Sequence, residues 1–174
     1  GTHIYDLGCS LGESIRSVET ALNGRDCRLV GVDNSPAMIS KAQEIDSGIT
    51  WHLADVTTLR LERSSVVIMN FTLQFIPIEE RLPLLTKIRK SMIPGGLLIL
   101  SEKLTLTDPD MDELMIDLHH DFKRSQGYTD LEIARKRDAI ENVLIPETAE
   151  THTQRLNEAG FSRSSIWFQC LDFA

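Results

Sequence analysis

Short apolar segments typical of buried strands alternate with amphipathic helical segments along most of the chain. Such alternation requires crossover connections between strands, which produce a mainly parallel sheet with helices on both faces. We therefore predict an α/β fold of the Rossmann-like class. The predicted strands are residues 3–7, 27–32, 49–53, 65–71, 97–102 and 165–173, and the predicted helices are residues 13–22, 36–45, 79–92 and 147–159.

The alternation is interrupted between the last two predicted strands. Residues 108–145 are rich in charge and mostly helical in pattern, and no strand is evident among them. We interpret this stretch as a helical insertion in one domain comprising residues 1–174. The chain enters its first strand at once, without an initiator Met, so we expect it to be a piece of a longer protein.

Charge and composition exclude several classes of protein. The net charge of -8 argues against a wide contact with nucleic acid, which requires many cations to displace phosphate counterions. The three cysteines, Cys9, Cys27 and Cys170, form neither a CxxC pair nor an even set, so we expect no disulfide framework and no metal site. No membrane span or signal peptide is evident, and we expect a soluble, cytoplasmic protein.

Polar residues and glycines stand where four of the predicted strands end. Gly8 and Gly12 follow the first strand, where glycine lets the backbone turn tightly and approach a ligand closely. Asp33 follows the second strand, about 20 residues beyond Gly12, where an acidic residue binds ribose hydroxyls in dinucleotide folds. Because ligands of open α/β sheets bind at these strand ends, the pattern predicts a nucleotide site.

Two further strand ends carry candidate ligand contacts. Asp55 follows the third strand and is placed to accept a hydrogen bond from an adenine amino group. Asn70 ends the fourth strand and can bind the amino acid part of a ligand or the backbone around it. Each of these side chains can equally cap a loop.

The glycine loop also matches the nucleophile elbow of α/β hydrolases, G-x-S-x-G, through Gly8, Ser10 and Gly12. An elbow requires an oxyanion-hole loop on an earlier strand, and only a few residues precede this motif. The order of elements therefore disfavours a hydrolase. We interpret the pair Trp51 and Trp167 as core residues rather than a cofactor platform.

Longer stretches of the chain carry a more specific pattern. They are residues 5–12, 33–39, 70–75, 100–103, 119–124, 136–137 and 167–170. In these stretches the chain resembles the class I S-adenosylmethionine (SAM)-dependent methyltransferases, and among them the bacterial carboxy-S-adenosyl-L-methionine synthases of tRNA wobble-uridine modification.

This resemblance implies a reaction that does not transfer a methyl group. SAM and prephenate would yield carboxy-SAM and phenylpyruvate, and a tRNA carboxymethyltransferase would then use carboxy-SAM to form 5-carboxymethoxyuridine. The cofactor contacts are expected within the segment that begins at Tyr5 and at later strand ends. The implied set is Tyr5, Gly8, Cys9, Ser10, Asp33, Asn34, Asp55, Val56, Asn70 and Arg137.

Arg137 is the one residue to which the resemblance assigns a role in catalysis, namely to bind the added carboxylate. The planar guanidinium can form two parallel hydrogen bonds with a carboxylate, which suits an acidic protein that handles anionic substrates. The cluster Arg135, Lys136 and Arg137 can equally be a solvated helix face. No side chain is an obvious general base.

The resemblance also implies features outside this chain. Members of the family form homodimers, carry a helical segment with a cofactor-site tyrosine before the first strand, and end with a further strand that is missing here. Two other functions stay open. One is an ordinary SAM-dependent methyltransferase acting on a small molecule, and the other is a non-catalytic nucleotide-binding subunit of a tRNA-modifying complex.

Overall fold

The computed structural model describes residues 1–22, 26–45, 47–140 and 143–174, and for residues 136–140 it describes the backbone alone. The chain divides into two compact units, Gly1–Ser101 and Glu102–Ala174. Whether the two units act as one domain stays a prediction.

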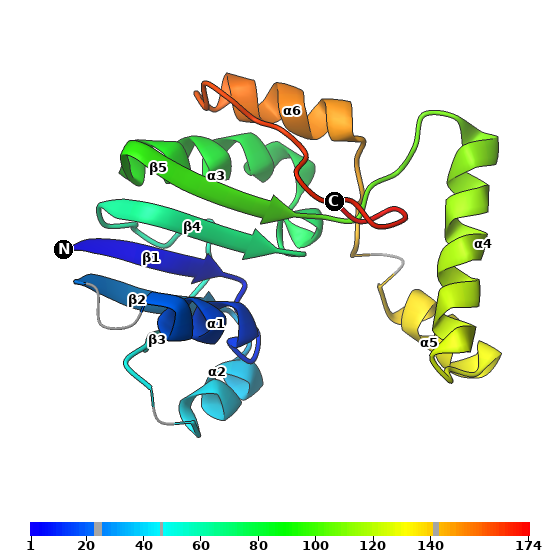
Figure 1. The fold of residues 1–174 in the computed structure, drawn as a ribbon, viewed down its shortest axis with the longest axis horizontal. Helices are drawn as coiled ribbons and strands as arrows, with labels where there is room; N and C mark the ends of the chain where they lie inside the picture. Colours follow the sequence, from blue (N-terminus) through cyan, green and yellow to red (C-terminus); the bar gives the residue numbers. More distant parts are fainter. Residues whose placement is uncertain (23–25, 46, 141–142) are drawn as a thin grey trace. The chain divides into compact units, whose positions relative to one another are not determined.

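A five-stranded, wholly parallel sheet forms the centre of the first unit (Figure 1). Its strand order is β3-β2-β1-β4-β5. The parallel α/β fold predicted from the alternating segments is therefore confirmed. The strands are β1 (Thr2–Leu7), β2 (Cys27–Asp33), β3 (Thr50–Leu53), β4 (Ser64–Asn70) and β5 (Met92–Ser101).

Helices cover both faces of this sheet. They are α1 (Glu13–Leu22), α2 (Pro36–Gln43) and α3 (Ile78–Ser91), with a short 3-10 helix, η1 (Leu73–Phe75), after β4. Helices α1 and α3 lie on opposite faces of the sheet (Figure 1), as the usual right-handed crossovers between parallel strands require when the chain builds outward on both sides of β1. Helix α2 begins with Pro36, whose missing N–H costs nothing in a first turn.

The hydrophobic core of the first unit lies between the sheet and these helices. On the α1 side, Ile15 packs with Ile4, Leu29 and Ile49, and Trp51 packs against this cluster. On α3, the fully buried residues include Leu85 and Ile88. The prediction that Trp51 is a core residue is confirmed.

Strand β5 begins earlier than the sequence pattern predicts. Ser64 pairs with Met92, but the next paired residues are Val66 and Leu97, so the added residues of β5 form an irregularity. Gly95 lies there with φ of 78°. The Pro-Gly-Gly stretch that indicates a turn before the strand is thus a bulge within it.

The described residues of the second unit form mainly three helices, which are α4 (Pro109–Ser125), α5 (Asp130–Ile140) and α6 (Ala149–Glu158). The Asp108 carboxylate accepts hydrogen bonds from two backbone N–H groups at the start of α4, and the Thr148 hydroxyl accepts one at the start of α6. Glu147 and Arg155 form a bidentate ion pair with N–O distances of 2.7 and 2.5 Å. The described part of residues 108–145 is mostly helical, as predicted.

The predicted strand at residues 165–173 is wrong. Only isolated bridges form there, between Cys170 and Phe173 and between Lys103 and Phe173. Cys170 and Phe173 exchange backbone hydrogen bonds across a tight turn, in which Leu171 has φ of 53°. Trp167 is 84% exposed, so its interpretation as a core residue is also wrong.

Candidate functional site

The order of the strands defines where a ligand site is expected. The chain fills the sheet outward from β1 through β2 to β3, then crosses to the other side of β1 with β4. Loops that follow strands on the two sides of such a switch point turn away from each other and leave a crevice at the carboxyl ends. Apart from Tyr5, which lies within β1, and Arg137, which lies in α5, the site residues predicted from the sequence lie at or just after the ends of β1, β2, β3 and β4.

The loop after β1 is a sharp bend that depends on glycine. Gly8 and Gly12 have φ of 79° and 84°, in the left-handed region that favours glycine, and Ser10 has φ of 49°. A Cβ atom on Gly8 would overlap the Thr72 side chain. The backbone N–H groups of Gly8 and Cys9 both donate to the Val32 carbonyl, which ties the bend to β2.

Trp51 and Arg16 support the other end of this bend. The Trp51 indole lies where a Cβ atom on Gly12 or Gly31 would be, so both glycines allow its close approach. The Arg16 guanidinium lies 5.3 Å from the indole centroid and also donates to the Leu11 carbonyl. The bend is therefore packed on rigid groups rather than free in solvent.

Asp33, at the end of β2, faces the glycine bend. Its Oδ2 accepts a hydrogen bond from the Ser10 N–H at 2.9 Å, and its Oδ1 accepts one from the Ser35 N–H at 2.9 Å. A carboxylate has about four acceptor positions, so it can still accept bonds from the hydroxyls of a sugar. The next residue, Asn34, is exposed at the same strand end.

Asp55 and Val56 lie in the loop after β3. The Asp55 Oδ1 accepts hydrogen bonds of 2.8 Å from both the N–H and the hydroxyl of Thr57. These bonds stabilise the ionised form and lower the Asp55 pKa. Asp55 is exposed whereas Val56 is buried, so the loop presents one carboxylate beside an apolar side chain.

Asn70, at the end of β4, joins three elements. Its Nδ2 donates to the Ser14 hydroxyl in α1 at 2.7 Å, and its Oδ1 accepts from the Ser101 hydroxyl of β5 at 3.0 Å. The side chain thus bonds to protein at both ends, which is the capping role that the sequence left open. A contact with ligand stays a prediction.

Asp6, which the sequence reasoning gave no role, is the most perturbed acid of the site. Its side chain is 1% exposed, and Oδ2 has no hydrogen-bond partner among the described residues. Burial raises the pKa of Asp6 to about 6, and the charge of Asp33 adds to the shift, although the Ile15 N–H opposes it. Its position directly before the glycine bend was the available indication.

Three of the predicted site residues, Tyr5, Ser10 and Cys9, are hydrogen-bonded or buried within the protein itself. Tyr5 is buried, and its hydroxyl accepts a hydrogen bond from the Glu62 N–H at 3.1 Å, which accounts for its side chain without a ligand. The Ser10 hydroxyl donates to the Met38 sulfur, whereas the serine of a nucleophile elbow donates to a histidine. Burial raises the pKa of the Cys9 thiol to about 12, so Cys9 is an unreactive thiol.

Arg137 lies in α5, within the second unit, and its side chain is outside the described residues. Its predicted role therefore stays a prediction. Within the described part of the chain, no group of three or more His, Cys, Asp or Glu residues could hold a metal ion. The same part contains no helix with the length and apolar character needed to cross a membrane.

Comparison of folds defines the class of protein first. Residues 4–96 match the model of the methyltransferase domain family. The cyclopropane synthase MmaA2 of Mycobacterium tuberculosis superposes with a TM-score of 0.65 at 20% identity, over 92% of this chain and 54% of that one. An S-adenosylmethionine-dependent methyltransferase of Mesorhizobium loti gives 0.63 at 19% identity, over 92% and 74%. The fold is that of a Rossmann-like SAM-dependent methyltransferase.

Sequence comparison then gives the narrower family. The carboxy-S-adenosyl-L-methionine synthase of Geobacter sp. strain M21 is 51% identical over all of this chain and 74% of its own length. The synthase of Shewanella oneidensis is 47% identical over 99% of this chain and 74% of its own length. The chain therefore belongs to the carboxy-S-adenosyl-L-methionine synthase family, as the resemblance in its motifs predicts.

Proposed function

We propose that this protein converts SAM and prephenate to carboxy-SAM and phenylpyruvate. The observation that carries the proposal is the Asp33 carboxylate, which faces the glycine bend at the switch point of the sheet and hydrogen-bonds to the Ser10 N–H. This is the arrangement that holds the sugar of a nucleotide in related folds. The identity of about half of all residues to synthases of this reaction supports the particular chemistry.

Features of the first unit fit SAM. The bend at Gly8 leaves no room for a side chain, because a Cβ atom there would overlap Thr72, and this close packing fixes the shape of the bend. Asp33 offers acceptors for the ribose hydroxyls, and Asp55 offers one for the adenine amino group.

The proposed reaction balances without an added oxidant or reductant. SAM supplies a sulfonium methyl group whose C–H bond can lose a proton. Prephenate loses carbon dioxide and hydroxide as its ring becomes aromatic, the hydroxide takes the methyl proton to give water, and the methyl carbon bonds to the carbon dioxide. The departing hydroxide therefore replaces a general base from the protein. The protein's task is to orient both molecules and exclude bulk water.

We assign carboxylate binding to Arg137, on the strength of its family position and of guanidinium chemistry. Replacing Arg137 with Ala should weaken the binding of carboxy-SAM by roughly tenfold to a hundredfold, since a charge-assisted hydrogen bond contributes about 1.5–3 kcal/mol. Binding of SAM should change little. Arg135, an exposed residue of the same helix, provides the matched control as Arg135→Ala. Equal weakening of both ligands by Arg137→Ala would remove it from this role.

An assay of the product separates the proposed function from the alternatives. The protein is incubated with SAM and prephenate, and the mass of the nucleoside product is measured by mass spectrometry. Carboxy-SAM is heavier than SAM by one carbon dioxide, whereas an ordinary methyltransferase leaves S-adenosylhomocysteine. A non-catalytic nucleotide-binding subunit would bind SAM without turnover until its partner is added. Either of these last results would overturn the proposal.

The wider setting is part of the same proposal. We expect a homodimer in the cytoplasm whose product is used by a tRNA carboxymethyltransferase to form 5-carboxymethoxyuridine at the wobble position. The net charge of -8 favours a role that supplies a small molecule over direct binding of tRNA. Sedimentation at increasing protein concentration tests the dimer, and titration with unmodified tRNA tests the absence of direct binding.

A further inference from the structure

The loop after β3 is held by hydrogen bonds that centre on Asp55. Its carboxylate Oδ1 accepts bonds from the N–H and hydroxyl of Thr57, and its carbonyl accepts bonds from the N–H groups of Thr58 and Leu59. Both side-chain bonds end on Oδ1, which leaves Oδ2 to meet a ligand. The direction of that second oxygen therefore depends on the peptide group that carries the Thr57 N–H.

Lys87 of α3 holds this peptide group from its other end. The Lys87 Nζ donates to the carbonyls of Val56 and Thr57, each at 2.7 Å. The Val56 carbonyl and the Thr57 N–H belong to the same peptide bond. A continuous path of two hydrogen bonds thus runs from the Lys87 ammonium through one planar peptide group to the Asp55 carboxylate.

The surroundings of Lys87 suit a positioning role. Its side chain is half-buried, and burial lowers its pKa, an effect that the nearby charge of Asp55 opposes. Moving an ammonium group out of water costs free energy unless hydrogen-bond acceptors of the protein replace the lost water. The two loop carbonyls and the Asp55 charge meet that requirement.

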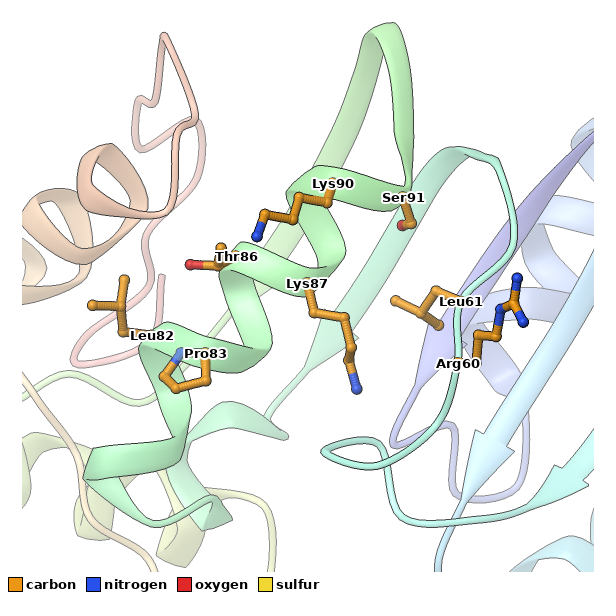
Figure 2. Close-up of a pocket in the computed structure, with 8 residues that line it drawn as sticks. All are labelled: Arg60, Leu61, Leu82, Pro83, Thr86, Lys87, Lys90 and Ser91. Carbon is orange, nitrogen blue, oxygen red and sulfur yellow. The ribbon is translucent and has the colours of Figure 1, made fainter.

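Lys90, one turn further along α3, shows that Lys87 is not simply one of several surface lysines. Both line an open groove of about 680 Å³ between α3 and residues 60–61. Figure 2 shows the two side chains leaving the helix in different directions, and Lys90 is exposed. The cations of this groove do not converge on one point, so the groove itself is a poor anion site.

We propose that Lys87 is a positioning residue that sets the Asp55 carboxylate for recognition of the adenine amino group. This inference rests on the proposed function, because it assumes that Asp55 meets adenine. Without Lys87, the peptide group between Val56 and Thr57 can rotate, and the carboxylate that it holds moves with it. The Lys87 ammonium itself does not touch the ligand.

The test compares two ligands that differ at the adenine amino group. S-Adenosylhomocysteine carries that group, and S-inosylhomocysteine carries a carbonyl oxygen in its place. The dissociation constants of both are measured by calorimetry for the unaltered protein, Asp55→Ala, Lys87→Met, Lys87→Gln and Lys90→Met. Thermal unfolding of each variant is recorded alongside, so that a loss of folding is recognised.

The unaltered protein should prefer the adenine ligand, and Asp55→Ala should lose this preference. Lys87→Met should weaken the binding of the adenine ligand about five- to tenfold and change the binding of the inosine ligand little. A loss of this size corresponds to one misplaced hydrogen bond. Lys87→Gln keeps a neutral hydrogen-bond donor, so its affinity for the adenine ligand should lie between that of Lys87→Met and that of the unaltered protein. Lys90→Met should match the unaltered protein. If Lys87→Met does not fold, the Gln variant gives the same comparison.

Three results would overturn the inference. A preference retained in full by both Lys87 variants would show that Asp55 does not depend on this lysine. Equal weakening of both ligands would show a purely structural role in the loop. Failure of the unaltered protein to bind S-adenosylhomocysteine would overturn the proposed function and this inference together, so the two failures are distinguishable.

Discussion

The buried Asp6 carboxyl should make the stability of the protein depend on pH in an uncommon direction. Its pKa is about 6 in the folded protein and 3.8 in the unfolded chain, so the folded state binds the proton more tightly. Ionisation therefore destabilises the fold above about pH 6. As the pH falls through the folded pKa, this destabilisation is relieved, and the gain levels off below the unfolded pKa.

Proton linkage with these two pKa values gives a gain of about 2 kcal/mol in unfolding free energy between about pH 7.5 and about pH 4.5. Asp6→Asn cannot titrate, so its own stability should lack this contribution. Urea denaturation of both proteins across that range, followed by circular dichroism, measures the difference between them. A difference that stays constant with pH would refute the reasoning. The comparison removes every titration that the two proteins share.

Three further predictions concern the bend, the ion pair and the thiols. Gly8→Ala should destabilise the protein by roughly 1–3 kcal/mol and weaken the binding of S-adenosylhomocysteine, because the added Cβ atom overlaps Thr72. The control Gly127→Ala is also at positive φ but lies in open space. It should destabilise the protein less and leave the affinity measured by calorimetry unchanged. Arg155→Met should cost about 3–5 kcal/mol, because it removes the guanidinium that pairs with the largely buried Glu147 carboxylate. Adding Glu147→Gln should recover part of this loss in urea denaturation. Alkylation of the native protein followed by mass spectrometry should label the exposed Cys170 and spare Cys9, and the reverse order would contradict the buried environment of Cys9.

The sequence predicts the parallel sheet well because its evidence is local. Most strands of the first unit contain a short apolar run, and the glycines and Asp33 at the ends of β1 and β2 lie together as expected. The strand expected at residues 165–173 failed for a nonlocal reason. An extended, apolar pattern does not specify a neighbouring strand, and Cys170 and Phe173 bond across a turn instead.

Two features of the site were beyond reach of sequence patterns. The burial of Asp6 depends on how α1 packs across β1. Its place in a strand before the glycine bend marks the position, but it does not predict that one carboxylate oxygen lacks a hydrogen-bond partner among the described residues. Lys87 stands in a helix with ordinary charged residues, 30 positions from the Thr57 carbonyl that it holds. Contacts between segments so distant in sequence become visible only once the fold brings α3 against the loop.

The double use of Asp33 has a consequence for how tightly this site can hold a nucleotide. Because its two oxygens already fix the backbone at Ser10 and Ser35, the strand end and the bend are ordered during folding, before any ligand arrives. Binding then costs the conformational and translational entropy of the ligand but little conformational entropy of the protein, which favours high affinity. For the same reason, a substitution of Asp33 would both disorder the ligand site and remove a ligand contact, so a loss of binding could not be assigned to the contact alone.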